Sequence, residues 1–296
     1  MTRVLVLGSK GILGQMVFRF LSRCDGVDVE HTCRAQKSDP SYFDVEDGLG
    51  RLFQIIEHYG PFDYFINCIG ITSNEIDETN SKSVQRAILV NSLFPHELAG
   101  LAREIGVRVI HISTDGVFAR DAGECMEDSP QQCFDIYGKT KSLGEVTETG
   151  FVNLRCSIIG PDDINKKGLL EWFYNQPQGA EVSGYTNHLW NGVTTLQFAK
   201  LCYKLILNDS FDAVRDEAHV HHFCPNQPLS KFELLQLFQS IFRPDVKITP
   251  FTDQKQRVSR ILGTRYYKLK KLFDEGQNIQ NAINELITEM KDRRKK

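Results

Sequence analysis

Near its start the chain reads RVLVLGSKGILG, residues 3–14, and the fold of the first half follows from this stretch. Four consecutive apolar residues, 4–7, run directly into a glycine, and from residue 12 to residue 21 apolar side chains recur at helical spacing. An apolar run that ends at glycine and continues into a helical pattern predicts a strand, a tight loop and a helix, in that order.

The three glycines of this stretch, Gly8, Gly11 and Gly14, have the spacing of a loop that binds a dinucleotide. Such glycines permit a tight turn, a close approach of the backbone to a pyrophosphate, and close packing of the helix. The phosphates would lie at the helix N-terminus, beside Ile12 and Leu13. An ordinary strand-to-helix turn is the alternative, but the position directly after the first strand favours the binding loop.

The alternation of apolar strands and amphipathic helices continues to about residue 160. Strands are predicted at 27–33, 62–69, 107–113 and 151–158, and helices at 49–58, 83–105 and 137–148. Repeated strand–helix units predict an α/β fold, a Rossmann-type doubly wound parallel sheet with helices on both faces. Ligands of such sheets bind at the carboxyl ends of the strands.

After Gly160 this rhythm breaks, because prolines and glycines separate short elements. We therefore expect a dinucleotide-binding domain at 1–160, with later contributions near 190–224, and at 161–296 mainly a smaller C-terminal substrate-binding lobe. In this second part the sequence predicts a strand at 219–224, a helix opened by a capping box at 230–233, and a last helix at 282–290.

The composition argues against several classes of protein. Apolar residues make up 41% and charged residues 25% of the 296 residues, and no run approaches the roughly 20 apolar residues of a membrane span. No stretch resembles a secretory signal, so we expect a cytoplasmic protein with no membrane partner. The formal net charge is −3, and the basic run at 291–296 is too small for a nucleic-acid-binding face.

A metal site is not expected either. The eight cysteines form no CxxC pair and no close cluster with histidine, which is typical of reduced thiols. His219, His221 and His222 suggest a metal only superficially, because alternation along a strand puts His222 on the opposite face from the other two. We expect a structural role for these histidines.

The end of the second predicted strand bears on the choice of cofactor. Arg34 follows there, where a carboxylate would bind the ribose 2′-hydroxyl of NAD and an arginine would pair with the 2′-phosphate of NADP. Arg34 therefore favours NADP(H), with a solvated surface arginine as the alternative. Asp44 and Val45 could line the adenine pocket, and a helix cap is an equally reasonable role for Asp44.

Two further motifs carry acid–base chemistry. Tyr137 and Lys141, in IYGKTKS at 136–142, share one face of a predicted helix, so the ammonium can stabilise tyrosinate and lower a pKa that is ordinarily about 10. Upstream, a strand runs out into HISTDGVF at 111–118, where a hydroxyl such as that of Thr114 can hold a substrate carbonyl. Taken alone, this hydroxyl suits a turn or cap equally well.

Together these motifs resemble the extended short-chain dehydrogenase/reductase superfamily and, within it, the dTDP-4-dehydrorhamnose reductase-like family of nucleotide-sugar reductases. The resemblance covers nearly the whole chain and is strongest up to residue 160. It is carried by the three spaced glycines and by Asn67-Cys68-Ile69-Gly70, Val90-Asn91, Ser113-Thr114-Asp115-x-Val117-Phe118 and Tyr137-x-x-x-Lys141.

The resemblance implies a role for each of these residues. Thr114 would orient the substrate oxygen, Tyr137 would donate the proton, and Lys141 would hold the nicotinamide ribose while supporting the acidity of the phenol. The hydride would come from the cofactor. Further positions of the cofactor site would be Cys68, Ile69, Gly70 and Asn91.

The residues around Asp115 help to choose among related activities. By the same resemblance, dehydratases carry a Glu after this Asp, whereas Gly116 follows here, and epimerase-reductases carry a Cys in place of Asp115. Plain ketone reduction is therefore favoured, and Asp115 would contact the substrate. Gly116 also departs from the Tyr of rhamnose-type reductases, which leaves the particular sugar open. Three residues of the predicted lobe could touch the sugar or base, namely His188, Trp190 and Asn191. For His188 and Trp190, packing between domains is the alternative.

We therefore expect an NADPH-dependent reductase that acts on a keto group, at C4, of a nucleotide-activated deoxyhexulose for surface polysaccharide or glycan synthesis. Two alternatives stay open. One is a nucleotide-sugar epimerase with bound NAD. The other is a non-catalytic subunit on the same fold, similar to the regulatory subunit of methionine adenosyltransferase. The expected partner is a nucleotide sugar, and a homodimer is compatible with the sequence.

Overall fold

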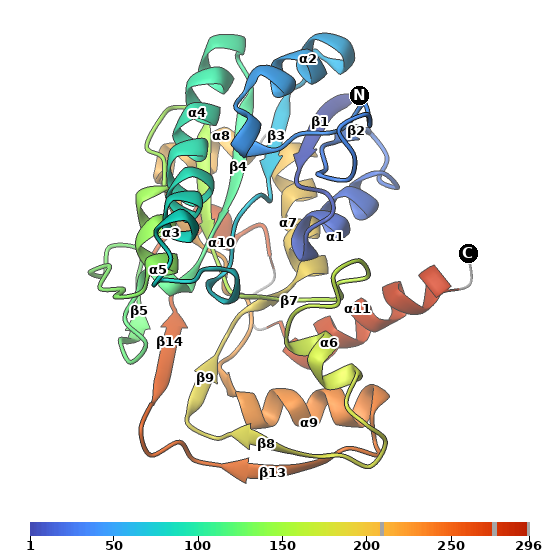
Figure 1. Ribbon diagram of the computed structural model, residues 1–296, viewed down its shortest axis with the longest axis vertical. Coiled ribbons are helices and arrows are strands. Elements are labelled where there is room, and N and C mark those ends of the chain that lie inside the picture. The colour runs from blue at the N-terminus through green and yellow to red at the C-terminus, as the bar shows by residue number, and fades with distance from the viewer. Residues whose placement is uncertain (208–209, 274–276, 295–296) are drawn as a thin grey trace.

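The computed structural model describes residues 1–207, 210–273 and 277–294. Its centre is a six-stranded sheet in the order β11-β6-β4-β3-β1-β2, and every neighbouring pair is parallel. This confirms the predicted doubly wound α/β fold (Figure 1). The strands are β1 (Thr2–Leu7), β2 (Val27–His31), β3 (Tyr64–Asn67), β4 (Arg108–Ser113), β6 (Phe151–Arg155) and β11 (Val220–His222).

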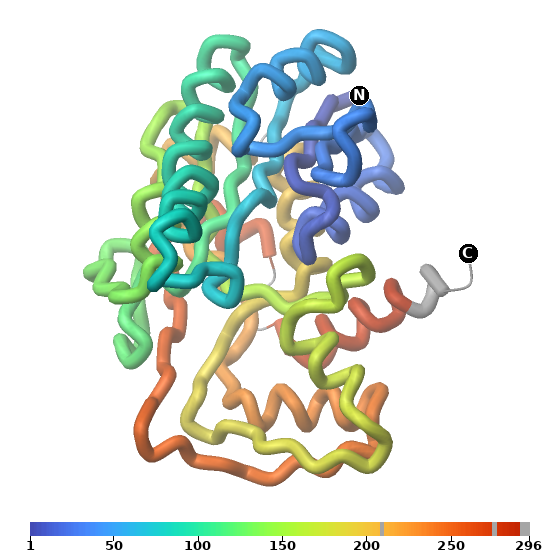
Figure 2. Tube along the Cα trace, in the orientation of Figure 1, coloured from blue at the N-terminus to red at the C-terminus, as the bar shows by residue number. Residues whose placement is uncertain are grey.

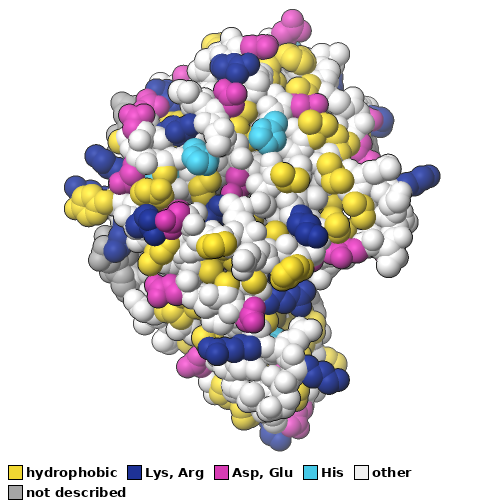
Figure 3. All heavy atoms as spheres, turned by 90° about the vertical axis from the view of Figure 1, so that its left-hand side faces the viewer, with side chains coloured by type: hydrophobic (Ala, Val, Ile, Leu, Met, Phe, Trp, Pro, Cys, Tyr) yellow, Lys and Arg dark blue, Asp and Glu magenta, His cyan; other side chains and the backbone are white. Residues whose placement is uncertain are grey.

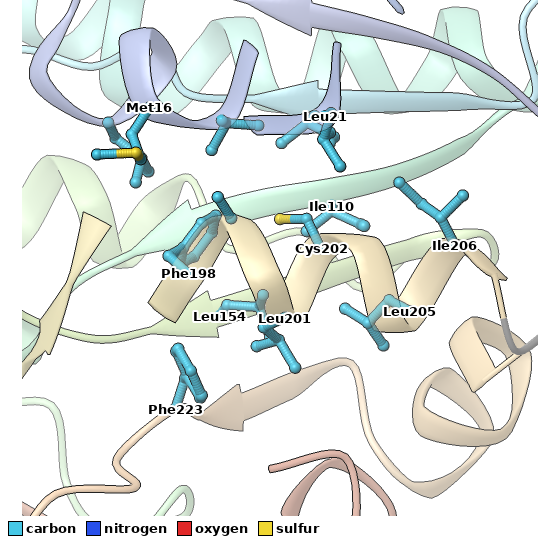
Figure 4. Packing of buried hydrophobic residues seen from close by; sticks show 14 of the residues in the cluster. Met16, Leu21, Ile110, Leu154, Phe198, Leu201, Cys202, Leu205, Ile206 and Phe223 are labelled. Carbon is cyan, nitrogen blue, oxygen red and sulfur yellow. The ribbon is translucent and has the colours of Figure 1, made fainter. Parts of the chain in front are cut away.

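Helices cover both faces of this sheet because each buried strand presents apolar side chains in both directions. Val4 and Val6 belong to the core on one face, and Leu5 and Leu7 to the core on the other. The first core is closed by α1 (Ile12–Leu21), α7 (Thr195–Leu207) and α8 (Ser210–Glu217), and the second by α2 (Gly50–Tyr59) and α4 (Phe94–Ile105). Figure 4 shows Met16 and Leu21 of α1 facing side chains of α7 across the first core.

The helix predicted at 83–105 is not continuous. The structure has α3 (Ser81–Ile88), a π-helical turn η3 (Leu89–Leu93) and then α4, and the N–H of Phe94 donates to the carbonyl of Leu89, five residues back. The extra residue turns Asn91 and Ser92 into the protein, where both are buried. Such turns are common at functional sites, and residue-by-residue periodicity does not reveal them.

The helix predicted at 137–148 is shorter than expected. It is α5 (Ile136–Leu143), and it ends because the chain passes against η3 at Gly144. A Cβ atom at Gly144 would collide with the carbonyl oxygen of Asn91, so this contact requires glycine. The second strand also ends early, at His31, and the hydroxyl of the next residue, Thr32, accepts a hydrogen bond of 3.1 Å from the N–H of Gly8.

The second half of the chain builds a smaller lobe below the sheet (Figures 1 and 2). Its helices are α6 (Leu169–Tyr174), α9 (Lys231–Phe242) and α11 (Ile279–Arg294), and α9 begins with the predicted capping box between Ser230 and Glu233. A four-stranded sheet orders β12 (Leu229–Ser230), β9 (His188–Trp190), β14 (Val258–Leu262) and β5 (Gly123–Cys125). The remaining pairs are β8 (Glu181–Tyr185) with β13 (Lys247–Phe251) and β7 (Ile158–Ile159) with β10 (Val193–Thr194), and a short α10 (Tyr267–Lys270) packs near α8.

Each half of the chain contributes helices or strands to the part of the structure that the other half mainly builds. Helices α7 and α8 and strand β11 come from the second half but complete the large sheet and its core, whereas β5 comes from the first half and is an edge strand of the lobe sheet. Figure 2 shows the chain leaving the lower lobe to enter α7 in the upper one. The predicted catalytic motifs therefore lie close to strands from both halves.

Candidate active site

The glycine loop between β1 and α1 has the shape that a pyrophosphate needs. Gly8 adopts φ 82°, which favours glycine, and a Cβ at Gly14 would collide with the carbonyl oxygen of Gly8. Helix α1 starts at Ile12, followed by Leu13, and its N-cap residue Gly11 makes no side-chain capping bond. No acidic residue lies in the first turn, so the positive end of the helix is available to an anion. The loop therefore fits a dinucleotide.

At the end of β2, Arg34 is mostly exposed and its guanidinium lies 4.0 Å from the carboxylate of Asp44. Asp44 caps the short helix η1 (Val45–Asp47) by accepting a hydrogen bond from the N–H of Glu46, as the alternative interpretation expected. Val45 is buried in the core beside the sheet. Arg34 thus sits where the sequence placed it, with a carboxylate beside it.

Three of the expected cofactor positions, Cys68, Ile69 and Gly70, follow the end of β3. Asn91 holds this segment, because its side chain accepts a hydrogen bond of 2.9 Å from the N–H of Ile71 and donates one of 3.0 Å to the carbonyl of the same residue. A Cβ at Gly70 would lie 3.5 Å from Oδ1 of Asn91 and 4.0 Å from Nζ of Lys141. The structure therefore brings Gly70, Asn91 and Lys141 together.

Tyr137 and Lys141 project from one side of α5. The ammonium of Lys141 is buried and donates a hydrogen bond of 2.7 Å to the carbonyl oxygen of Ile112, at the end of β4. Burial lowers the pKa of Lys141 to about 8, and the nearby carboxylate of Glu145 acts in the opposite direction. Lys141 is therefore much closer to losing its proton than an ordinary lysine.

The expected acidification of Tyr137 by Lys141 is wrong for this state of the protein. Burial raises the pKa of Tyr137 to about 12, and the hydrogen bond with Thr114, the next largest effect, lowers it only in part. The physical reason is that Lys141 directs its ammonium to Ile112, whereas the phenol loses its hydration. Tyr137 consequently stays protonated over the whole neutral range.

Thr114 stands at the point where β4 ends and the short helix η4 (Asp115–Val117) begins. Its hydroxyl accepts a hydrogen bond of 3.0 Å from the N–H of Gly116, so it is a cap, and it donates one of 3.2 Å to Asp115. A Cβ at Gly116 would lie 3.1 Å from a ring carbon of Tyr137 and 3.2 Å from the Thr114 hydroxyl. The absence of a side chain at Gly116 therefore lets Thr114 and Tyr137 lie close together.

These residues line a cavity of about 310 Å³ between the large sheet and the lobe. Four of the predicted site residues face it, namely Thr114, Asp115, Tyr137 and His188. His188 is stacked on Tyr185 at 4.2 Å between ring centroids. The sequence did not indicate the other polar residues of the cavity, among them Arg120 and Arg260, because they belong to no recognisable motif. The pairing of β14 with β5 brings Arg260 here.

Trp190 and Asn191 do not line the cavity. Both are buried, and the indole N–H of Trp190 donates a hydrogen bond of 2.8 Å to the hydroxyl of Ser157. Asn191 donates to the carbonyl and accepts from the N–H of Leu262, at 2.7 and 3.1 Å. For Trp190 this is the packing role that the sequence left as an alternative, and Asn191 likewise makes contacts within the lobe.

The late histidines hold the protein together as expected. Nε2 of His221 donates to the carbonyl of Val214 at 2.9 Å, and Nδ1 of His222 donates to the carbonyl of Gly263 at 2.6 Å. Within the described ranges no group of three or more histidine, cysteine, aspartate or glutamate side chains could hold a metal ion.

Comparison with known proteins assigns the chain to a family. The family model described as the RmlD substrate binding domain matches residues 1–158, more than half of the 296 residues. The chain belongs to the RmlD substrate binding domain family. The match spans the RmlD-type glycine loop, the Thr114 motif and the Tyr137–Lys141 pair.

RmlD-family relatives among curated proteins include the spore coat polysaccharide biosynthesis protein SpsK of Bacillus subtilis (strain 168), 33% identical over 49% of this chain and 47% of SpsK. A dTDP-4-dehydrorhamnose reductase of Streptomyces griseus is 31% identical over 55% of this chain and 52% of its own length. The chain thus spans about half the length of these relatives. Methionine adenosyltransferase 2 subunit beta of Xenopus tropicalis is 23% identical over 85% of this chain and 76% of its own length.

Solved structures confirm the fold of this RmlD-family chain. The dTDP-4-dehydrorhamnose reductase of Bacillus anthracis str. Ames, solved in complex with NADP, superposes with a TM-score of 0.77 at 18% identity and covers 98% of this chain and 99% of its own. An ADP-L-glycero-D-manno-heptose-6-epimerase of Helicobacter pylori reaches a TM-score of 0.73 at 14% identity, covering 97% and 96%. At such identities the likeness concerns the fold.

Two further observations concern the surface. On the face that carries α3, α4 and α5, acidic and basic side chains are interspersed with apolar ones, and no single charge dominates (Figure 3). Among the described residues there is no helix with the length and apolar character that crossing a membrane requires.

Proposed function

We propose that this protein is an NADPH-dependent reductase that reduces a keto group, at C4, on a nucleotide-activated deoxyhexulose for surface polysaccharide or glycan synthesis. The observation that carries the proposal is the shared cavity of Thr114 and Tyr137. Lys141 lies one helical turn from Tyr137 and beside Gly70 and Asn91. The glycine loop at α1, which fits a pyrophosphate, supports a dinucleotide as the cofactor.

The chemistry follows from the protonation states of these residues. Tyr137, with a pKa of about 12, holds its proton at neutral pH and donates it to the oxygen of the substrate carbonyl. Thr114 positions that oxygen through its hydroxyl. A nicotinamide bound in this cleft supplies the hydride that reduces the carbonyl carbon. The charged form of Lys141 would hold the ribose of the nicotinamide, and water reprotonates the tyrosinate left behind.

The choice of substrate is supported by the relatives. The Streptomyces griseus relative is a dTDP-4-dehydrorhamnose reductase, and SpsK is a polysaccharide biosynthesis protein. Asp115 followed by Gly116 favours plain reduction, because no Glu or Cys stands there for elimination or epimerisation. Because all eight cysteines are free thiols, a reducing compartment fits, and we place the reaction in the cytoplasm.

NADPH is the proposed cofactor because Arg34 lies at the end of β2. The test is a fluorescence-quenching titration with NADPH and with NADH, on the natural protein and on Arg34→Ala. We expect tighter binding of NADPH, and a loss of this preference in Arg34→Ala with little change for NADH. Equal affinities in the natural protein would contradict the role given to Arg34.

One observation favours a second function, that of a non-catalytic regulatory subunit. The similarity to methionine adenosyltransferase 2 subunit beta extends over 85% of this chain, further than the similarity to the Streptomyces griseus reductase. A regulatory subunit on this fold would need no turnover. Retention of Thr114, Tyr137 and Lys141 in one site argues for the reductase. The epimerase alternative has the support of the fold alone, and Arg34 in place of an acid argues against its bound NAD.

One experiment separates these functions. Nucleoside-diphosphate 4-ketosugars carrying dTDP, UDP, GDP or CDP are incubated with the protein and NADPH, and the loss of absorbance of NADPH is followed. The reductase consumes NADPH with at least one of them, and Tyr137→Phe abolishes this while keeping its affinity for NADPH. A regulatory subunit binds NADPH and consumes none, and turnover that survives in Tyr137→Phe would show that the proton donor is misassigned.

A further inference from the structure

Arg260 reaches the catalytic cavity from the other half of the chain. Strand β14 lies between β9 and β5 in the lobe sheet, with Val258 opposite His188 and Arg260 opposite Gly123. Side chains alternate along a strand, so Val258 and Arg260 both line the cavity whereas Ser259 between them is buried. The lobe thus presents a cation to the catalytic motifs of the first half.

The guanidinium of Arg260 is aimed at the catalytic segment. Its Nε lies 3.7 Å from Oδ2 of Asp115, and the other carboxylate oxygen of Asp115 accepts the hydrogen bond from Thr114. The side chains of Asp115 and Arg260 are 15% and 22% exposed, so the pair is shielded from bulk water. A chain of polar contacts therefore runs from Thr114 through Asp115 to Arg260.

Nε of Arg260 is buried and has no hydrogen-bond partner among the described residues. A buried N–H without an acceptor is unfavourable, so an oxygen atom brought by a ligand would relieve that cost. The charge of Arg260 also reaches the phenol, because Arg260 acts to lower the pKa of Tyr137 whereas Asp115 acts to raise it. Because Arg260 lines the same cavity as Thr114 and Tyr137, it can contact a sugar bound there.

We propose that Arg260 determines substrate specificity by donating a hydrogen bond to an oxygen substituent of the sugar, beside the carbonyl that Thr114 and Tyr137 hold. Asp115 positions the guanidinium for this contact. The inference rests on the proposed reduction of a nucleotide sugar and assigns the recognition of the sugar ring to the lobe. It also explains why the motif has an aspartate after Thr114.

The cavity contains a natural control for this idea. Arg120 lines the same cavity, but its side chain is 60% exposed, pairs with Asp135 at 3.9 Å, and donates to Gln256 at 3.2 Å. Arg120→Met removes a positive charge from the same cavity and leaves the contact between Arg260 and Asp115 in place. A general effect of charge would therefore appear equally in Arg120→Met and Arg260→Met.

The experiment measures binding by calorimetry, with dTDP and dTDP-rhamnose as ligands and NADPH present. We expect Arg260→Met to weaken binding of dTDP-rhamnose by roughly 10- to 100-fold, the value of one charge-assisted hydrogen bond. Binding of dTDP and of NADPH, and binding of dTDP-rhamnose by Arg120→Met, should stay within about twofold. Arg260→Lys, which keeps the charge, should recover part of the loss.

The outcomes separate the inference from the proposed function. If the natural protein binds neither this nucleotide sugar nor any of the UDP, GDP or CDP counterparts, the proposed function and the inference both fail. If it binds one and Arg260→Met binds it equally, the inference alone is overturned. If Arg260→Met loses affinity for the free nucleoside diphosphate as strongly as for the nucleotide sugar, Arg260 binds the phosphates. That result also overturns the inference. Should Arg260→Met not fold, Asp115→Asn tests the same contact and should weaken binding of the sugar only.

Discussion

Burial moves the pKa values of Tyr137 and Lys141, which lie one helical turn apart on α5, in opposite directions. It raises that of Tyr137 to about 12 and lowers that of Lys141 to about 8, because in each case burial disfavours the charged form. At neutral pH the phenol is therefore protonated and the amine is largely charged. This is the combination that proton donation to a ketone needs.

The pH dependence of ketone reduction should therefore follow Lys141. As the pH rises through about 8 the ammonium loses its proton, so kcat/KM should fall with an apparent pKa near 8. Ionisation of Tyr137 should not change kcat/KM below pH 10. The measurement is initial NADPH oxidation between pH 6 and pH 10. Lys141→Arg stays charged over this range, so its residual activity should lack the alkaline limb. The same limb in that variant would show that another group titrates.

A buried ion pair lies beside the end of β4, from which Thr114 follows. Arg155 and Glu145 form two hydrogen bonds of 2.7 Å, and their side chains are 2% and 5% exposed. Ser113, the residue before Thr114, donates a hydrogen bond of 2.6 Å to the same carboxylate. Nε2 of His222 accepts from Arg155 at 3.3 Å, and this connects β11 to the pair.

Removing Glu145 should destabilise the protein strongly. Glu145→Ala leaves Arg155 charged and buried without its partner, which costs about 3–5 kcal/mol of the free energy of unfolding. The control is Glu148→Ala, which breaks the exposed pair with Arg103 and should cost less than about 1 kcal/mol. Urea denaturation measures both. Similar losses in the two variants would show that burial of the Glu145 pair contributes little.

At the scale of elements, the site depends on how closely α5 packs against η3. The π-helical turn points Asn91 toward the loop after β3, and its side chain also donates to the hydroxyl of Thr140 on α5 at 3.2 Å. Ser92 donates to the carbonyl of Thr140 at 2.7 Å. Gly144 permits this approach, because any larger residue would meet the backbone of Asn91. The position of Lys141 is therefore set by two neighbouring elements.

Gly144→Ala should lower both stability and activity. Its Cβ would collide with the backbone of Asn91, so α5 must move away from η3 and Lys141 must move with it. We expect a loss of at least about 1–3 kcal/mol in the free energy of unfolding, as for other overpacked sites. Gly100→Ala is the matched control: Gly100 lies inside α4 with nothing within 4 Å of its Cβ, and the change should stabilise by roughly 0.5–1 kcal/mol. Equal effects would refute the packing argument.

At the scale of the whole molecule, the cavity exists because the two halves of the chain interleave. Thr114 and Tyr137 come from the first half and His188 and Arg260 from the second, and β5 carries the first half into the lobe sheet. Several histidines became buried in forming this assembly. Burial lowers the pKa of each of five of them, namely His31, His111, His219, His221 and His222.

Mild acid should therefore destabilise the whole protein. In the unfolded chain these histidines bind protons as the pH falls through about 6.5, whereas in the folded protein they bind them only at lower pH, so the unfolded state gains stability. Each unit of lowered pKa contributes up to about 1.4 kcal/mol to this loss. Thermal unfolding at pH 7.5, 6.5 and 5.5 should show a falling midpoint. His111→Gln keeps an acceptor for Asn67 and should flatten the dependence, and a midpoint that rises toward pH 5.5 would contradict the argument.

Much of the fold was accessible from the sequence because its signals are local. The apolar run before Gly8, the helical spacing after it, the capping box at Ser230 and the four-residue spacing of Tyr137 and Lys141 all involve neighbours in the chain. The helix bounds that went wrong, at 83–105 and 137–148, did so where a distant segment intervened: the approach of Asn91 and Gly144 changes both elements. No local pattern contains that contact.

The sequence by itself determined the parallel α/β sheet, the glycine loop and the placement of Tyr137 and Lys141 on one side of a helix, because periodicity and short spacings encode them. Only the tertiary structure decided that Arg260 faces the cavity, that Trp190 and Asn191 hold the lobe together, and that Tyr137 becomes less acidic rather than more. The physical reason is that burial, solvation and partner groups are set by segments that meet only after folding, and these control both contact and charge.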